Sequence, residues 1–306
     1  MSSEARELTH KPFSGLMGGA MATLVILVVA RFVLEVAGVS QHIARFVSST
    51  TGLHFVAIFV AAVGPLRGGL TRFAQLPVPA LILAARTEAW IIVATIIAAV
   101  FHLQRSHFAG EEDLAGNWRH LAGHVFGHTV EAGVLFLIIL LLMTVVHVLW
   151  RWPVTVAPGA ALGVIVIMRF WTEAMGLEPF RTAAWSSTVL VLFSAFYLGG
   201  VGGRIGLTEA RQLLVPSLVL GWVWRFWVYL ATVFAAYVPF FKTHFFDQSR
   251  GDVPLRLLRT LGISIVEGFI VGIFVWGGAV WIACATHPRS AIDAARTSRD
   301  DSTFAS

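Results

Sequence analysis

The chain has 306 residues, of which 57% are hydrophobic and only 13% are charged, and its mean hydropathy is +0.78. Soluble domains carry about a quarter charged residues, so this composition excludes an ordinary soluble domain and indicates helices solvated by lipid. The formal net charge is +5, but the basic residues lie in short loops between apolar runs, so we expect no nucleic-acid partner. The single cysteine, Cys284, excludes an intrachain disulfide and a cysteine-based metal site.

Eight apolar runs approach or reach the roughly twenty residues that a helix needs to cross a bilayer. We therefore predict an all-α integral membrane protein with eight transmembrane helices. They cover approximately residues 14–38, 47–66, 77–101, 122–149, 155–177, 184–202, 213–240 and 260–285. Polar tails at residues 1–12 and 286–306 flank them. We interpret the first run as a retained helix, because it is longer than the core of a typical signal peptide.

The chain contains a tandem duplication. Residues 67–83 return as residues 204–220 at an offset of 137, with ten of the seventeen positions identical. Residues 31–38 match residues 169–176 at an offset of 138. Further matches between the two copies lie in the third span, in the loop after it and in the fourth span. They include Trp90 with Trp227, His107 with His244 and Glu131 with Glu267. We predict two four-helix repeats, residues 13–149 and 150–285. Because each has an even number of spans, the repeats are parallel and related by a pseudo-twofold axis along the membrane normal.

Arginines in the short loops predict the orientation in the membrane. Those on the side of the termini are Arg67, Arg72, Arg151, Arg204 and Arg211, and those on the opposite side are Arg45 and Arg181. Positive charge accumulates in cytoplasmic loops. We therefore expect both termini in the cytoplasm and a location in the plasma membrane, the inner membrane of a bacterium.

The repeated stretch predicts a tight turn that leads into a new helix. Its polar residues are Arg67, Thr71 and Gln75 in the first copy and Arg204, Thr208 and Gln212 in the second. The threonine hydroxyl is suited to capping the helix, and the glutamine to adding a second contact. A purely structural role explains these residues. The alternative is a docking or lipid-headgroup surface on which Arg67 and Arg204 face phosphate, and we expect bound lipids.

Six of the charged residues inside the predicted spans are repeated with the same charge: Arg31, Glu35, Glu131, Arg169, Glu173 and Glu267. Each Arg–Glu pair on the first span of a repeat is one helical turn apart and is expected to form an ion pair, and the glutamate on the fourth span is expected to complete an Arg–Glu–Glu cluster. Such clusters either lock the bundle together or form a proton or cation path. Glu88 and Arg225 occupy equivalent positions with opposite charge, which predicts a pair between the two repeats.

Three histidines, His120, His124 and His128, lie four residues apart at the start of the fourth span and therefore on one helical stripe. Imidazole suits a transition metal or a haem iron, with His54 or His147 as further haem ligands. A second helix or loop has to complete any such site. The second repeat lacks this stripe, so a cofactor site there would belong to the first repeat alone. Otherwise the stripe contacts headgroups, loops or a partner chain.

The sequence has no recognisable catalytic motif, and we do not expect an enzyme. Three functions fit these residues. The first is a non-catalytic membrane subunit that anchors or organises a larger complex, with other subunits or copies of itself as partners. The second is a transporter or channel with a polar pathway between the two repeats. The third is a haem- or metal-binding redox protein that uses the histidine stripe.

Overall fold

A computed structural model describes residues 3–103, 105–109, 118–182, 186–207, 209–238, 243–247 and 252–286, with side chains at all of these except residues 3–12, 42, 109, 179, 180 and 203. The described residues form helices joined by turns and irregular segments, and they include no strand. The helices are α1 (Ser3–Val36), α2 (Gln41–Ala44), α3 (Ser49–Val63), α4 (Pro77–Val100), α5 (Trp118–Leu149), α6 (Val156–Ala174), α7 (Pro179–Thr182), α8 (Ser187–Gly202), α9 (Ala210–Tyr237) and α10 (Val253–Thr286). Short 3₁₀ helices are η1 (Gly64–Arg67), η2 (Phe73–Gln75), η3 (His107–Ala109), η4 (Pro153–Thr155) and η5 (Gly203–Ile205).

The described part of the chain is all-helical, and its long apolar helices are those expected of an integral membrane protein. Among the described residues, seven helical segments are long and apolar enough to cross a bilayer: Phe13–Val36, Ser49–Arg67, Phe73–Val100, Trp118–Leu149, Pro153–Ala174, Ala210–Tyr237 and Val253–Thr286. The eighth predicted span coincides with α8, which is apolar but has only 16 residues. At 1.5 Å per residue α8 is about 24 Å long, which is shorter than a typical hydrocarbon core of about 30 Å.

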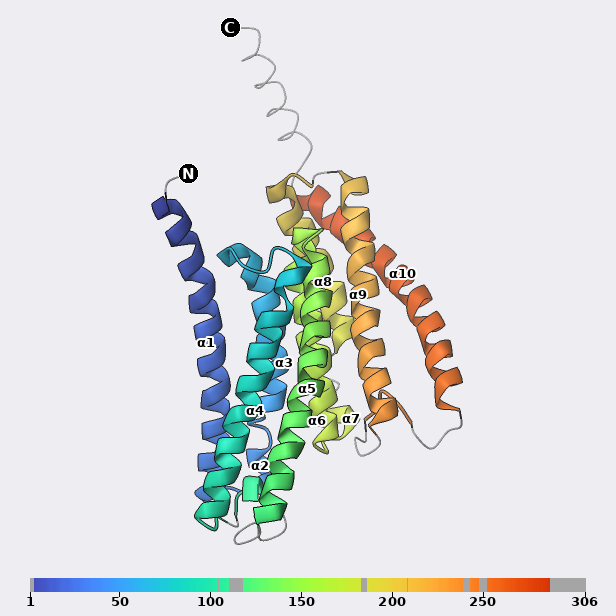
Figure 1. Ribbon diagram of the computed structural model, residues 1–306. Helices are drawn as coiled ribbons and strands as arrows, with labels where there is room; N and C mark the ends of the chain where they lie inside the picture. The colour runs from blue at the N-terminus through green and yellow to red at the C-terminus, as the bar shows by residue number, and fades with distance from the viewer. Residues whose placement is uncertain are drawn as a thin grey trace, which may run out of the picture. The chain divides into compact units, whose positions relative to one another are not determined.

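The chain divides into two compact units, residues 1–148 and residues 149–306. In the first unit α1 and α4 run in one direction and α3 and α5 in the other (Figure 1). The helices α1, α3 and α4 pack against one another. Leu27 of α1 lies directly against Gly52 of α3, so a side chain at Gly52 would have to displace the end of the Leu27 side chain. The fourth helix, α5, is joined to α4 by Leu121 against Ala99 and by a polar cluster described below.

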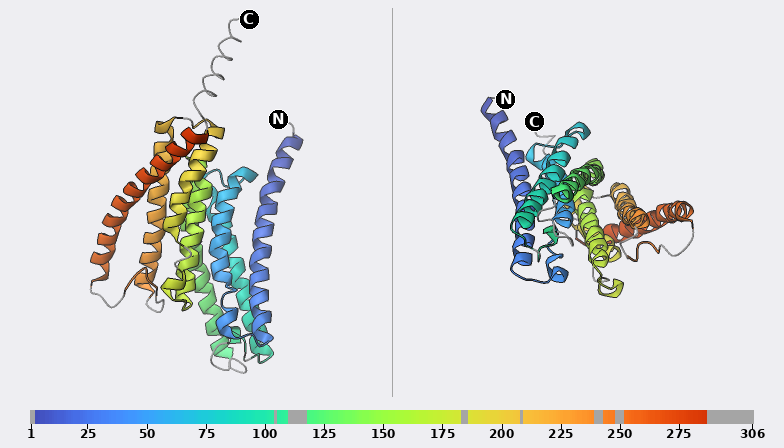
Figure 2. Two further views of the ribbon diagram at one scale, coloured as in Figure 1. Left: turned by 180° about the vertical axis from the view of Figure 1, so that it is seen from behind. Right: turned by 60° about the horizontal axis from the view of Figure 1, so that its bottom comes forward.

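In the second unit α9 and α10 lie side by side in very close contact (Figures 1 and 2). Glycines make this approach possible. A Cβ on Gly221 of α9 would lie 2.7 Å from the backbone nitrogen of Gly272 on α10, and a Cβ on Gly268 would lie 3.1 Å from the carbonyl oxygen of Gly221. Small residues four positions apart are a recurrent way to bring membrane helices together, because lipid offers no hydrophobic driving force between helices.

Tryptophans add hydrogen bonds between the helices of the second unit. The indole nitrogen of Trp227 on α9 donates to the carbonyl oxygen of Gly159 on α6 at 3.0 Å. The indole nitrogen of Trp224 donates to the hydroxyl of Ser187 on α8 at 2.9 Å. Both indoles are buried, so these bonds satisfy donors that lipid could not. They place α9 at the centre of its unit.

The repeated turn is capped by its glutamines. The backbone N–H of Arg72 donates to Oε1 of Gln75 at 3.0 Å, and that of Glu209 donates to Oε1 of Gln212 at 3.1 Å. Thr71 was expected to cap the helix, but its hydroxyl donates to the Gln75 oxygen at 3.3 Å instead. Glutamine takes the role because its longer side chain reaches back across one turn. Thr208 lies outside the described residues. Arg67 and Arg204 are exposed.

The glycine contact between α9 and α10 predicts that Gly221→Ala destabilises the protein. The new methyl group would meet backbone atoms of Gly268 and Gly272, which cannot rotate away. Overpacking of this kind costs about 2 kcal/mol. Thermal unfolding in detergent, followed by circular dichroism, measures the effect. Gly277→Ala on α10 is the matched control, because nothing lies within 4 Å of a Cβ there. Equal unfolding temperatures for the two variants would contradict the proposed backbone contact.

Candidate functional site

Glu35 is the centre of the first polar cluster. Its side chain is fully buried at the end of α1. Nε of Arg31, one turn earlier, donates to Oε1 at 3.2 Å. The other oxygen, Oε2, lies 2.7 Å from Nδ1 of His107 and accepts the backbone N–H of His107 at 3.0 Å and the hydroxyl of Ser106 at 3.2 Å. One carboxylate therefore ties the end of α1 to the loop that follows α4.

Glu173 is the centre of a matching cluster in the second unit. Nε of Arg169 donates to Oε1 at 3.1 Å. The backbone N–H of His244 donates to Oε2 at 2.9 Å, and Nδ1 of His244 lies 2.5 Å from the same oxygen. The hydroxyl of Thr182 on α7 donates to Oε1 at 2.6 Å. This carboxylate ties the end of α6 to the loop after α9.

The backbone around these two carboxylates is also the same in both units. Gly38 and Gly176 have positive φ angles of 90° and 93° and follow the two helix ends. Gly38 donates to the carbonyl of Glu35 at 3.0 Å, and Val39 to that of Leu34 at 2.9 Å. The second unit has the corresponding bonds from Gly176 to Glu173 and from Leu177 to Thr172. This arrangement is a glycine-dependent helix cap, which presents each carboxylate to its loop.

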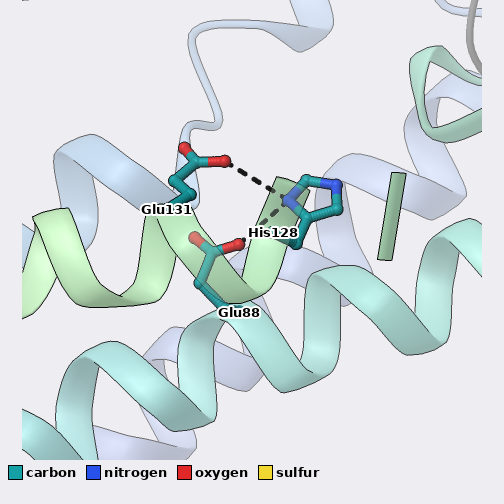
Figure 3. A group of neighbouring side chains, drawn as sticks. All are labelled: Glu88, His128 and Glu131. Atoms are coloured by element: carbon teal, nitrogen blue, oxygen red, sulfur yellow. Dashed lines mark hydrogen bonds and ion pairs between the residues drawn. The ribbon is translucent and has the colours of Figure 1, made fainter. Parts of the chain in front are cut away.

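A different cluster lies near the middle of α4 and joins it to α5 (Figure 3). Oε2 of Glu88 lies 3.0 Å from Nδ1 of His128, and Oε2 of Glu131 lies 3.3 Å from the same nitrogen. One ligand atom from each of the three residues lies within 4.8 Å of the others. Glu88 is buried, and its second oxygen, Oε1, has no hydrogen-bond partner among the residues that the structure describes. Carboxylate and imidazole groups in this arrangement are able to hold a divalent metal ion.

The second unit has a polar cluster at the corresponding positions of α9 and α10. Nη2 of Arg225 lies 2.6 Å from Oε2 of Glu267 and donates to the hydroxyl of Ser264 at 3.4 Å. In the sequence, Arg225 corresponds to Glu88 at the offset of 137, and Ser264 and Glu267 correspond to His128 and Glu131 at an offset of 136. A guanidinium is therefore present where the first unit has a carboxylate.

The histidine stripe borders an open groove of about 520 Å³. Nε2 of His120 and Nε2 of His124 are 3.3 Å apart, and both side chains line the groove together with His128 and Glu131. Every residue that lines the groove belongs to α5. The stripe thus leads along one face of α5 to the cluster at Glu88. Glu88 was not among the metal ligands predicted from the sequence, because its place opposite His128 depends on how α4 and α5 are rotated.

The remaining predicted residues have other surroundings. The structure groups Glu131 with His128 and Glu267 with Arg225, whereas we expected them beside Arg31 and Arg169. Glu88 and Arg225 each have partners within their own unit, and a pair between the repeats stays a prediction.

The two further histidines considered as haem ligands lie in α3 and α5. Nδ1 of His54 is 2.6 Å from the carbonyl oxygen of Thr50, on its own helix. The ring of His147 packs edge-on against Phe73, with centroids 4.5 Å apart. The role of His107 and His244 was not foreseen, although the repeated His-Phe pair at residues 107–108 and 244–245 was a visible signal.

The buried carboxylate of Glu35 predicts a large effect of Glu35→Ala on stability. The substitution leaves Arg31, Ser106 and the N–H of His107 without their acceptor. Breaking a buried ion pair on one side costs about 3 kcal/mol, which thermal unfolding in detergent will measure. Glu178→Ala is the control, because Glu178 pairs with Arg181 on an exposed surface and contributes little. A Glu35→Ala protein as stable as the control would show that the loop is held by other contacts.

Comparison with known protein families, with curated proteins and with solved structures finds no match.

Proposed function

We propose that the protein is a non-enzymatic membrane protein whose first unit binds a divalent transition-metal ion between Glu88, His128 and Glu131. The observation that carries this proposal is the convergence of three ligand atoms, from two helices, within 4.8 Å of one another. Ligands about 2.1 Å from a shared metal in tetrahedral geometry lie about 3.4 Å apart. The distances of 3.0 and 3.3 Å from the His128 nitrogen to the two carboxylates are close to that spacing.

The charges of the cluster favour a bound cation. When both Glu88 and Glu131 are ionised they contribute two negative charges, and the cluster then keeps one net negative charge even with His128 protonated. A charge at bilayer depth costs about 3 kcal/mol on insertion scales unless it is compensated. The unpartnered Oε1 of the buried Glu88 leaves an acceptor open for the ion. In the second unit Arg225 and Glu267 already balance each other, so no ion is needed there.

The spacing of the helices also supports a bound ion in the first unit and none at the corresponding place in the second. The α9–α10 contact depends on Gly221, Gly268 and Gly272. At the corresponding positions the first unit has Ala84, Ala132 and Phe136. These larger side chains accompany a wider separation of α4 and α5, which approach less closely than α9 and α10 do. We infer that the separation accommodates the imidazole of His128 and a metal ion.

The donor set favours an ion over haem. Imidazole with two carboxylates suits the first-row divalent ions, such as Zn²⁺, Co²⁺, Ni²⁺ and Mn²⁺. His120 and His124 lie on the same groove and supply an entry path or further ligands. A porphyrin needs two faces of protein, whereas the groove is lined by α5 alone.

Metal analysis of the purified protein tests the proposal. After removal of bound metal with a chelator and addition of Zn²⁺ or Co²⁺, we expect one ion per chain, and we expect visible absorption from the Co²⁺ form. Glu88→Gln and His128→Ala each remove a ligand and should weaken binding by about tenfold or more, since even mutations outside the ligand set weaken binding by 10- to 100-fold. Glu267→Gln is the matched control in the second unit and should bind as the natural protein does.

Three outcomes would count against the site. One is equal binding by Glu88→Gln and the natural protein. Another is loss of binding in His120→Ala with retention in Glu88→Gln, which would place the ion on the stripe alone. The third is a Soret band in the purified protein, which would favour haem. Metal uptake into sealed vesicles that contain the protein would assign transport to the same site.

We also propose that the chain is a tandem duplication with eight spans. The matching clusters at Glu35 and Glu173, with the same donors and the same glycine caps, support it. The 16 residues of α8 continue into η5 as α3 continues into η1, which supports a crossing by α8 as well. The arginine bias of the loops supports cytoplasmic termini.

A subunit role in a larger complex is the second candidate. The described segments between the spans are turns and short helices such as α2 and α7, which have four residues each and leave little room for a catalytic domain. This role predicts stable partner chains after purification in mild detergent, identified by mass spectrometry. Recovery of the chain alone, as a monomer or homo-oligomer, would contradict it.

A further inference from the structure

A second feature of the first unit is a groove between α1 and α3, separate from the polar clusters. It has a volume of about 710 Å³. Gly15 and Gly19 form part of its α1 side, Phe55 and Phe59 part of its α3 side, and Arg67 lies at one end. A Cβ on either glycine would meet nothing within 4 Å, so the space beside them is open.

The length of the groove matches one leaflet of a bilayer. Along α1 it extends from Gly15 to Thr23. Eight steps of 1.5 Å give about 12 Å, and half of a typical hydrocarbon core is about 15 Å. Both helices belong to segments apolar enough to cross the membrane. The groove therefore has the depth that an acyl chain of one leaflet occupies.

The chemistry changes from apolar to basic along the groove. Thr23 is the polar residue at its deep end, and its hydroxyl donates to the carbonyl oxygen of Gly19 on the same helix at 2.9 Å. The other end is the turn after α3, where Phe13 of α1 packs against Gly69. Arg67 lies in that turn and is exposed at the end of the groove opposite Thr23. An apolar groove that ends at a guanidinium group fits a lipid whose acyl chain lies in the groove and whose anionic headgroup lies at the guanidinium.

We propose that this groove binds one anionic phospholipid, with an acyl chain between α1 and α3 and its phosphate at Arg67. The lipid fills a space that neither helix fills. It also bridges the two helices in the part of the unit where glycines give them few side-chain contacts. The proposal is independent of the metal site, since the two share no residue.

Lipid analysis tests the proposal on the full-length protein. The protein is exchanged into detergent micelles that contain equal amounts of phosphatidylglycerol and phosphatidylcholine, and retained lipid is quantified by mass spectrometry. We expect about one phosphatidylglycerol per chain. Arg67→Ala should weaken retention of phosphatidylglycerol relative to phosphatidylcholine by about fivefold, as expected for one basic residue at an anionic headgroup. Arg204→Ala, at the equivalent turn of the second unit, should leave the ratio unchanged.

A glycine pair controls for folding. Gly19→Leu places a side chain in the groove and should abolish retention, whereas Gly18→Leu changes the neighbouring exposed position, which does not line the groove, and should not. Equal retention by these two variants would overturn the proposal. So would no preference for phosphatidylglycerol in the natural protein. A change of oligomeric state in Gly19→Leu with lipid retention unaltered would also overturn it, because it would show that a partner helix occupies the groove.

Discussion

A charged group inside a membrane needs a partner, and this requirement organises the four polar clusters described above. Water is absent from the hydrocarbon core, so each carboxylate must be met by donors from the chain or by a bound cation. Glu35 and Glu173 meet it fully, with an arginine one turn away and backbone and side-chain donors from a loop. Because those donors come from distant parts of the sequence, satisfying the charge also fixes how the helices of a unit connect.

The two clusters near the middle of the spans, at Glu88 and at Arg225, provide a partner for the buried charge in different ways. In the second unit the cation is built into the chain as Arg225, held between Glu267 and Ser264. In the first unit the corresponding residue is Glu88, and a histidine is the only basic group of the cluster. If the units descend from one ancestor, a single change of charge would separate a permanently neutral cluster from one that attracts ions. Structural and binding roles would then have been divided between the copies.

Much of the fold follows from the sequence, but the composition of the clusters does not. Long apolar runs predict the spans because lipid permits only hydrogen-bonded helices there, and glycines mark the helix ends at Gly38 and Gly176. The i, i+4 ion pairs at Arg31 and Arg169 depend only on local geometry and were visible in the sequence.

Contacts between helices depend on register and rotation. Glu131 lies thirteen residues into α5, about 20 Å along its axis, while Glu35 is one residue from the end of α1. The sequence alone does not place the two helices relative to each other, so the choice of His128 as the partner of Glu131 was not predictable.

Helix separation connects the packing of each unit to its chemistry. Glycines let α9 and α10 approach until their backbones touch, and a flexible guanidinium on a long side chain can still reach its carboxylate across such an interface. The proposed ion beside the imidazole would need room between two helices, and α4 and α5, which have alanines and a phenylalanine in place of the glycines, approach each other less closely than α9 and α10 do. The cost is a weaker direct contact between α4 and α5, since fewer backbone atoms meet. If an ion is bound as proposed, its coordination by residues of both helices would compensate for that loss by linking them, and the stability of the unit would then depend on the ion.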